Sequence, residues 1–120
     1  MLFSGVYTST FSGKNSYMDR IAALTELLTE DPNNAFARYG LAMEYSNSAD
    51  FDRALDEFGK LLASNPDYVP GYQMCAQTFV KAGRATEAKS MLENGIAVAQ
   101  RKGDSHAESE MQAMLDEISS

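Results

Sequence analysis

The stretch "ADFDRALDEFGKLLASNP", residues 49–66, controls the sizes and the spacing of its apolar side chains. Its aromatic, small and leucine residues recur three or four positions apart, the spacing that places side chains on one face of a helix. Asn65-Pro66 ends this helix, because the residue before a proline avoids the α region. Almost nothing reactive lies nearby, so the pattern indicates packing rather than chemistry.

The same pattern returns when the chain is shifted by 34 positions along itself. Residues that fall on one another are alike in size or polarity: Leu24 with Phe58 and Leu92, Leu27 with Leu61, Leu28 with Leu62, Pro32 with Pro66, Leu41 with Cys75, Ala42 with Ala76, Tyr45 with Phe79, and Ala54 with Ala88. Similarity at one fixed offset indicates a repeat architecture.

Each repeat unit contains two helical patterns separated by a turn. The sequence predicts a first unit over residues 35–68 and a second over residues 69–102. A lone helix over residues 18–31 precedes them, and a capping helix over residues 104–119 follows them. We therefore expect a single all-α domain over residues 18–120, an array of about six antiparallel helices.

Local signals mark the ends of the outer helices. Ser16, with Asp19 three residues on, can cap the first helix, and Gly103 ends the second unit. Ser105 and Glu108 form a further capping-box signature that opens the final helix. That helix is out of step with the 34-residue offset, as suits an end cap, and its apolar face consists of Met111, Met114, Leu115 and Ile118.

With these residues the chain resembles the tetratricopeptide repeat family over roughly residues 18–118. The first unit matches the family pattern at Leu41, Ala42, Tyr45, Ala54, Phe58, Leu61 and Pro66, and the second at Cys75, Ala76, Phe79, Ala88 and Leu92. Four positions depart from the pattern: Arg38 replaces the early Trp, Tyr72 holds that place in the second unit, Gly95 holds a small position, and Gln100 replaces the second Pro. The resemblance implies a right-handed helical solenoid.

The small residues of the pattern have a structural reason. Ala42, Ala54, Ala76 and Ala88 stand where two helices are expected to cross closely. A larger side chain there would push the helices apart. The opening stretch is thus predicted to encode a helix crossing.

Composition excludes several function classes. The chain has 120 residues, a formal charge of −7 and a pI near 4.5, which disfavours nucleic-acid and membrane partners. From Asp104 onward it carries five carboxylates and no Lys or Arg. Cys75 is the only cysteine, so an internal disulfide and a cysteine-based zinc site are excluded, and a reducing cytoplasm is the expected compartment.

The start of the chain, residues 1–17, is rich in Gly, Ser and Thr. It lacks the basic and apolar regions of a signal peptide. We expect a poorly ordered tail or a mis-called start, for which Met18 would serve. The alternative is a docking segment, because Phe3, Tyr7 and Phe11 fall four positions apart.

Candidates for chemistry are few. His106 lies two residues after Asp104 and four before Glu110, but no second His exists. We interpret it as a solvated side chain, and Cys75 as a buried, inert thiol. The sequence contains no phosphate-binding loop or nucleophile motif. We therefore expect no metal, no cofactor and no enzymatic activity.

In the resembled family, ligands lie along the concave face, which the first helices of the units line. The implied positions are Phe36, Tyr39, Met43, Ser46 and Asn47 in the first unit and Pro70, Gln73, Gln77, Val80 and Lys81 in the second, with Met111 or Met114 of the final helix as further candidates. Tyr39, Met43, Gln73 and Gln77 replace the cations and amides that grip a peptide carboxylate in one subset of the family. This favours a partly apolar peptide or helix, unless Tyr39 and Met43 only pack against neighbouring helices.

The function that follows is a non-catalytic adaptor that binds another protein in this groove. The alternative is a structural module that buries its groove or an end helix against another copy of the same chain.

Overall fold

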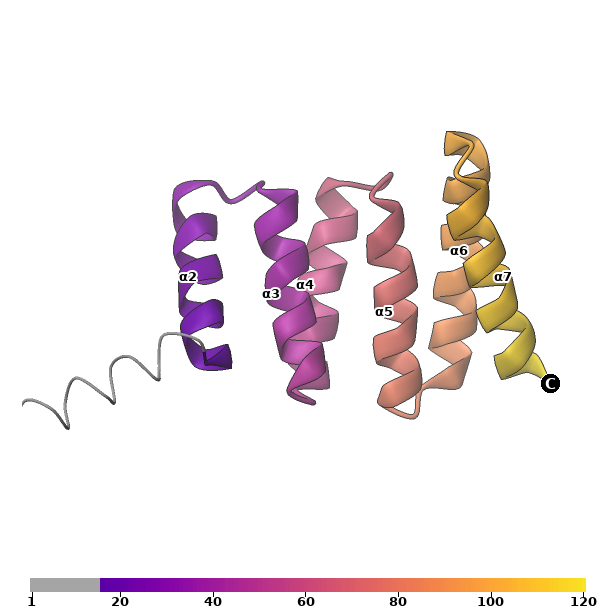
Figure 1. The fold of residues 1–120 in the computed structure, drawn as a ribbon, viewed down its shortest axis with the longest axis horizontal. Helices are drawn as coiled ribbons and strands as arrows, with labels where there is room; N and C mark the ends of the chain where they lie inside the picture. The colour runs from indigo at the N-terminus through magenta and orange to yellow at the C-terminus, as the bar shows by residue number, and fades with distance from the viewer. Residues whose placement is uncertain (1–15) are drawn as a thin grey trace, which may run out of the picture.

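The computed structural model describes residues 16–120, which form six helices joined by short loops (Figure 1). Residues 1–15, and with them most of the expected tail, lie outside the described residues. The all-α helical repeat expected from the sequence is confirmed. The helices are α2 (Tyr17–Glu30), α3 (Ala35–Asn47), α4 (Phe51–Ser64), α5 (Val69–Lys81), α6 (Ala85–Lys102) and α7 (Ser105–Ser119).

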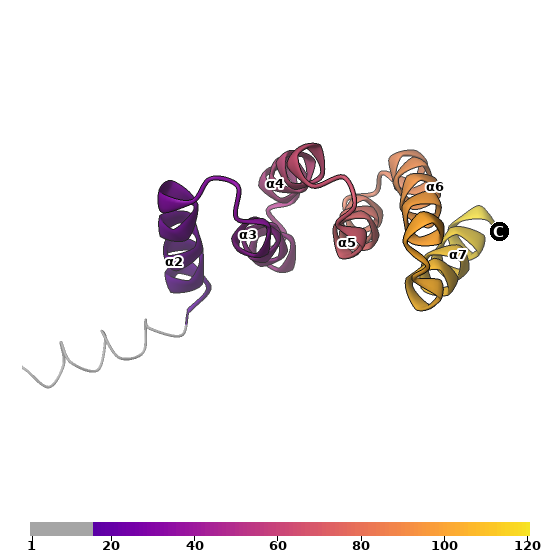
Figure 2. The same cartoon turned by 90° about the horizontal axis from the view of Figure 1, so that it is seen from above.

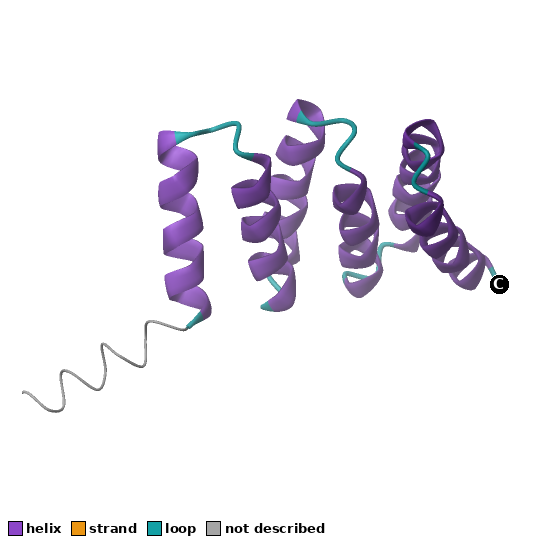
Figure 3. Cartoon of the chain, turned by 45° about the horizontal axis from the view of Figure 1, so that its top comes forward, coloured by secondary structure: helices purple, strands orange, loops and turns teal. Residues whose placement is uncertain are grey.

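The helices are arranged in two layers. Seen from above, α3, α5 and α7 form one layer, and α4 and α6 form the other (Figure 2). Successive helices run antiparallel, and the loops alternate between the upper and lower edges of the array (Figure 3). The radius of gyration is 17.1 Å, whereas a compact domain of 100 residues has one of about 13 Å. The array is therefore elongated.

The core is divided along the array instead of forming one centre. One buried cluster gathers around Phe58 and Leu61 of α4, and it includes Cys75 of α5. A second gathers around Leu92 of α6 and Met111 of α7. Because most helix–helix contacts join successive helices, stability rests mainly on contacts between near neighbours.

The first helix begins and the second unit ends at the residues that the local sequence signals predict. The Asp19 backbone N–H donates to Ser16 Oγ at 3.2 Å, as the sequence predicts. Tyr17, which we had assigned to the tail, is already the first residue of α2. Gly103 ends α6 in the left-handed conformation with φ of 70°, which costs a glycine little.

The expected cap of the final helix is wrong by one residue. The Ala107 backbone N–H donates to Asp104 Oδ1 at 3.1 Å, so Asp104 and not Ser105 is the N-cap. Ser105 is the first residue inside the helix. Asp and Ser both cap helices well. Asp104 is the cap because it stands three positions before Ala107, whose backbone N–H has no partner inside the helix.

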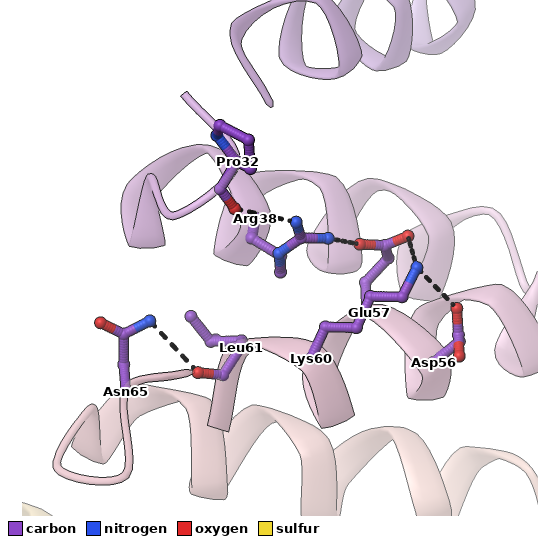
Figure 4. Close-up of polar contacts among 7 residues, drawn as sticks. All are labelled: Pro32, Arg38, Asp56, Glu57, Lys60, Leu61 and Asn65. Carbon is purple, nitrogen blue, oxygen red and sulfur yellow. Dashed lines mark hydrogen bonds and ion pairs between the residues drawn. The ribbon is translucent and has the colours of Figure 1, made fainter. Parts of the chain in front are cut away.

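Two different side chains replace the early Trp of the family pattern in equivalent ways. Arg38 Nη2 donates to the Pro32 carbonyl at 3.1 Å, and Arg38 Nη1 pairs with Glu57 Oε1 of α4 at 2.6 Å (Figure 4). In the second unit Tyr72 Oη donates to the Pro66 carbonyl at 2.7 Å. Pro32 and Pro66 are themselves 34 positions apart. Both side chains thus tie the first helix of a unit to the loop before it.

The small residues lie where the helices cross. Ala42, Ala54, Ala76 and Ala88 are all fully buried, as their sizes predict. Helices also approach closely at Gly95 of α6: a Cβ built there would lie 2.6 Å from Tyr72 Cβ of α5 and 2.6 Å from Met111 Sδ of α7. Gly95 is therefore the point at which three helices meet.

Candidate protein-binding groove

The layer formed by α3, α5 and α7 presents the surface that the sequence indicated as a groove. In this layer α3 contacts α5, and α5 contacts α7, whereas α4 and α6 make fewer contacts with each other. Helices that lie closer together on one side curve the array toward that side. We call the exposed face of α3, α5 and α7 the concave face.

The positions expected on α3 divide into exposed and packed ones. Phe36 is 73% exposed, and Asn47 is exposed as well. Tyr39 is half-buried: its ring lies edge-on to Phe58, with centroids 6.4 Å apart, and 5.5 Å from the ring of Tyr68. Burial, with a smaller contribution from Tyr68, raises the pKa of the Tyr39 phenol. Tyr39 therefore serves the packing between α3 and α4.

Two further α3 positions are tied to neighbouring helices. Met43 is half-buried against the cluster around Phe58. Ser46 is buried, and its Oγ lies 2.9 Å from Thr78 Oγ1 of α5. Since Thr78 Oγ1 donates to the Met74 carbonyl at 2.8 Å, Ser46 is the donor of this pair. Ser46 joins α3 to α5 and is not free for a partner, so its expected place on the groove surface is wrong.

The expected positions on α5 include two half-buried glutamines and three exposed residues. Gln73 and Gln77 are half-buried, and Gln73 Nε2 donates to Glu110 Oε1 of α7 at 3.3 Å. This bond brings the side chains of the second unit to the capping helix. The exposed positions of α5 among those expected are Pro70, Val80 and Lys81.

An open hollow of about 810 Å³ lies where α5 meets α7. Apolar and acidic side chains share its lining, and α7 supplies five of the six residues. Met111, one of the two methionines suggested from the sequence, is fully buried beneath the surface and does not reach the hollow. The lining residues are Gln73, Glu110, Ala113, Met114, Asp116 and Glu117.

The hollow is strongly acidic. Three of its lining residues are carboxylates, and α7 contains no Lys or Arg. The side chains that contact these carboxylates offset little of their negative charge. Gln112 Nε2 donates to Asp116 Oδ1 at 3.0 Å, and His106 Nε2 lies 3.2 Å from Glu110 Oε2. Uncompensated carboxylates beside apolar atoms attract a cationic side chain with an apolar stem.

Sequence reasoning missed Glu110, Ala113, Asp116 and Glu117. The 34-residue offset could not place them, because α7 is out of step with the repeat. The run of carboxylates after Asp104 was the available signal, but it did not show on which side of the array they gather.

The remaining candidates for chemistry are a metal site, His106 and Cys75. Residues 16–120 contain no group of three or more side chains placed to hold a metal ion. His106 is exposed on α7, as expected. Among these residues, none of the helices has the length and apolar character needed to cross a membrane.

Cys75 is buried in the cluster around Phe58, and burial raises the pKa of its thiol to about 12. We therefore expect a thiol-reactive maleimide at pH 7 to leave the native protein unlabelled, because the thiolate is the reactive form. Unfolding in urea should restore one labelled site per chain. Mass spectrometry before and after unfolding checks this, and rapid native labelling would show that the region around Cys75 opens.

The sequence profile described as the tetratricopeptide repeat matches residues 45–115, more than half of the chain. The chain belongs to the tetratricopeptide repeat family. A tetratricopeptide repeat protein of Pseudomonas aeruginosa is 30% identical over 98 residues, which cover 82% of this chain and 93% of the relative. The matched residues extend from α3 into α7.

Solved structures agree with this assignment. The solution structure of a tetratricopeptide repeat domain protein from Salinibacter ruber is 32% identical, with a TM-score of 0.69, covering 73% of this chain and 89% of that one. PcrH, solved in complex with the chaperone-binding region of PopD, is 17% identical with a TM-score of 0.80, covering 98% and 88%. At that identity PcrH shows a shared fold alone. The fold is that of the tetratricopeptide repeat.

Proposed function

We propose that this tetratricopeptide repeat protein is a non-catalytic adaptor that binds a peptide or helix of a partner protein on its concave face. The observation that carries the proposal is the open hollow between α5 and α7, which continues a face with exposed apolar side chains. The PcrH neighbour, with the chaperone-binding region of PopD, supports this kind of ligand for the fold. The partner surface then comprises Phe36, Tyr39, Met43, Asn47, Gln73, Gln77, Val80 and Lys81, with Tyr39 and Met43 contributing only their exposed parts.

The lining of the hollow also indicates the chemistry of the partner. An amphipathic segment with Lys or Arg at one end would place its cation among Glu110, Asp116 and Glu117 and its apolar part on Met114. The acidic surface disfavours nucleic acid and anionic membranes for the same reason. The buried thiol suits the cytoplasm.

The test is a pull-down from the source lysate with three full-length baits: the wild type, a groove variant and a control. The groove variant Glu110→Lys/Glu117→Lys reverses two charges beside the hollow. The control Asp52→Lys/Glu93→Lys reverses two exposed charges on α4 and α6, in the other layer, so its net charge is the same. Partners are identified by mass spectrometry.

We expect proteins that the wild type and the control retain and the groove variant loses. Binding of a synthetic segment from such a protein, measured by calorimetry, should weaken about tenfold or more on charge reversal, since close interfacial charge pairs couple strongly. Equal recovery by all three baits would contradict the assignment of the concave face. Recovery of the chain itself, lost in the groove variant, would support the alternative of a self-associating module.

A further inference from the structure

Among the described residues, one side of α2 lacks a neighbour that the other second helices have. α2 lies at the end of the array and packs against α3 (Figures 1 and 2). By the 34-residue offset it is the second helix of a unit, equivalent to α4 and α6. Each of those helices packs between the first helix of its own unit and the helix that follows. Within residues 16–120, α2 has the following helix alone.

The missing contact is visible at one repeat position, which Leu27, Leu61 and Gly95 share. In α6 this position touches both neighbours, because a Cβ at Gly95 would meet Tyr72 of α5 and Met111 of α7. In α4 Leu61 is 0% exposed, whereas in α2 Leu27 is 44% exposed. Leu27 is therefore much less buried than Leu61, which occupies the equivalent position in α4.

The rest of α2 shows the same deficit. None of its described residues is buried, whereas α4 and α6 both contain buried residues. Leu24, equivalent to the fully buried Phe58, is directed at α3: its Cδ2 would lie 3.2 Å from a Cβ on Gly40. The apolar residues of α2 thus cover α3 but have no cover on the opposite side from the described chain.

The residues that precede α2 have the length and the pattern of the absent helix. The 34-residue offset sets residues 1–13 on α3 (Ala35–Asn47), and residues 14–16 on the turn between α3 and α4. It also aligns a hydrophobic residue, a small residue and an aromatic residue in all three places: Tyr7, Thr8 and Phe11 with Leu41, Ala42 and Tyr45, and with Cys75, Ala76 and Phe79.

We propose that residues 1–13 of the same chain dock on the uncovered face of α2 as the first helix of a third repeat. The linker at residues 14–16 is as short as the turn at residues 48–50. A short covalent linker gives an effective concentration of about millimolar, which favours this segment over a second copy of the chain. Three repeats with a cap also meet the usual minimum for a stable array.

Arg20 is the one large departure at this crossing, because Ala54 and Ala88 hold the equivalent places. Its Nε pairs with Glu44 Oε2 of α3 at 2.9 Å. This ion pair ties the Arg20 side chain to α3. The crossing at α2 therefore has to accommodate a longer side chain than the alanines of α4 and α6.

The test compares the same substitution in two full-length backgrounds. Leu27→Ser is made in the wild type and in Tyr7→Ser/Phe11→Ser, and the folding equilibrium constant is measured by urea unfolding. Contacting residues show non-additive effects, so we expect Leu27→Ser to lower the constant about fivefold more in the wild type than in the segment variant. Amide hydrogens of α2 should also exchange faster in Tyr7→Ser/Phe11→Ser than in the wild type.

Val80→Ser is the matched control. Val80 is 42% exposed, close to Leu27, but lies on α5, so its substitution should have the same effect in both backgrounds. Equal effects of Leu27→Ser in the two backgrounds would overturn the proposal. So would a wild-type dimer in sedimentation equilibrium that Leu27→Ser abolishes, because a second copy would then cover α2.

Discussion

Replacing Gly95 by alanine is expected to destabilise the protein by about 1–3 kcal/mol, the usual cost of overpacking a core. The added Cβ would lie 2.6 Å from Tyr72 Cβ and 2.6 Å from Met111 Sδ. The thioether of Met111 can turn away, but Tyr72 Cβ is fixed to the backbone of α5, so α5 and α6 must separate. Urea unfolding monitored by circular dichroism measures the change in free energy.

Gly59 provides the matched control in α4. It is exposed, and a Cβ there would meet no atom within 4 Å. Gly59→Ala should therefore stabilise the helix, by about 0.5–1 kcal/mol, because alanine has less conformational freedom to lose on folding. The same substitution is thus expected to destabilise the protein at Gly95 and to stabilise it at Gly59. A stabilising Gly95→Ala would show that α5, α6 and α7 are less closely packed than described.

Ending the chain after Gly103 is expected to have an even larger effect, because it removes all of α7. Met111 is fully buried, and Met114, Leu115 and Ile118 pack against the same cluster. Burying such side chains contributes about 1.5–3 kcal/mol for each one fully buried. Their loss removes much of the roughly 5–15 kcal/mol that stabilises a typical domain. The melting temperature should fall by more than about 10 °C, and the exposed face of α6 should reduce solubility.

Two full-length variants separate the loss of packing from the shortening of the chain. Met111→Ala keeps α7 but should cost about 2–5 kcal/mol. Met111→Leu conserves volume and should cost less than about 1.5 kcal/mol. Unchanged melting of the chain that ends at Gly103 would contradict the role of α7 as a cap.

Much of the fold could be predicted because its determinants are local or periodic. The proline at position 66, the glycine at position 103 and the serine at position 16 act on the backbone within one turn of a helix. The 34-residue offset then relates positions in successive units without knowledge of their contacts. Asp104 was missed because two good capping residues stand side by side and differ only in their distance from Ala107.

The candidate site was predicted less completely. Repeat register placed Tyr39 and Ser46 on the concave face, but Tyr39 packs on Phe58 and Ser46 is bonded to Thr78. Register assigns a residue to a side of its helix, whereas exposure depends on how closely the next helix approaches. The carboxylates of α7 lay outside the register altogether.

The sequence by itself determined the helices, their order and the positions where they cross, because spacing and side-chain size act through short-range geometry. Only the tertiary structure decided that three helices meet closely at Gly95 and that Gln73 meets Glu110 beside an acidic hollow. Both depend on the angle at which α7 packs on α5 and α6. That angle results from many weak contacts among three helices, and no single stretch of the chain encodes it.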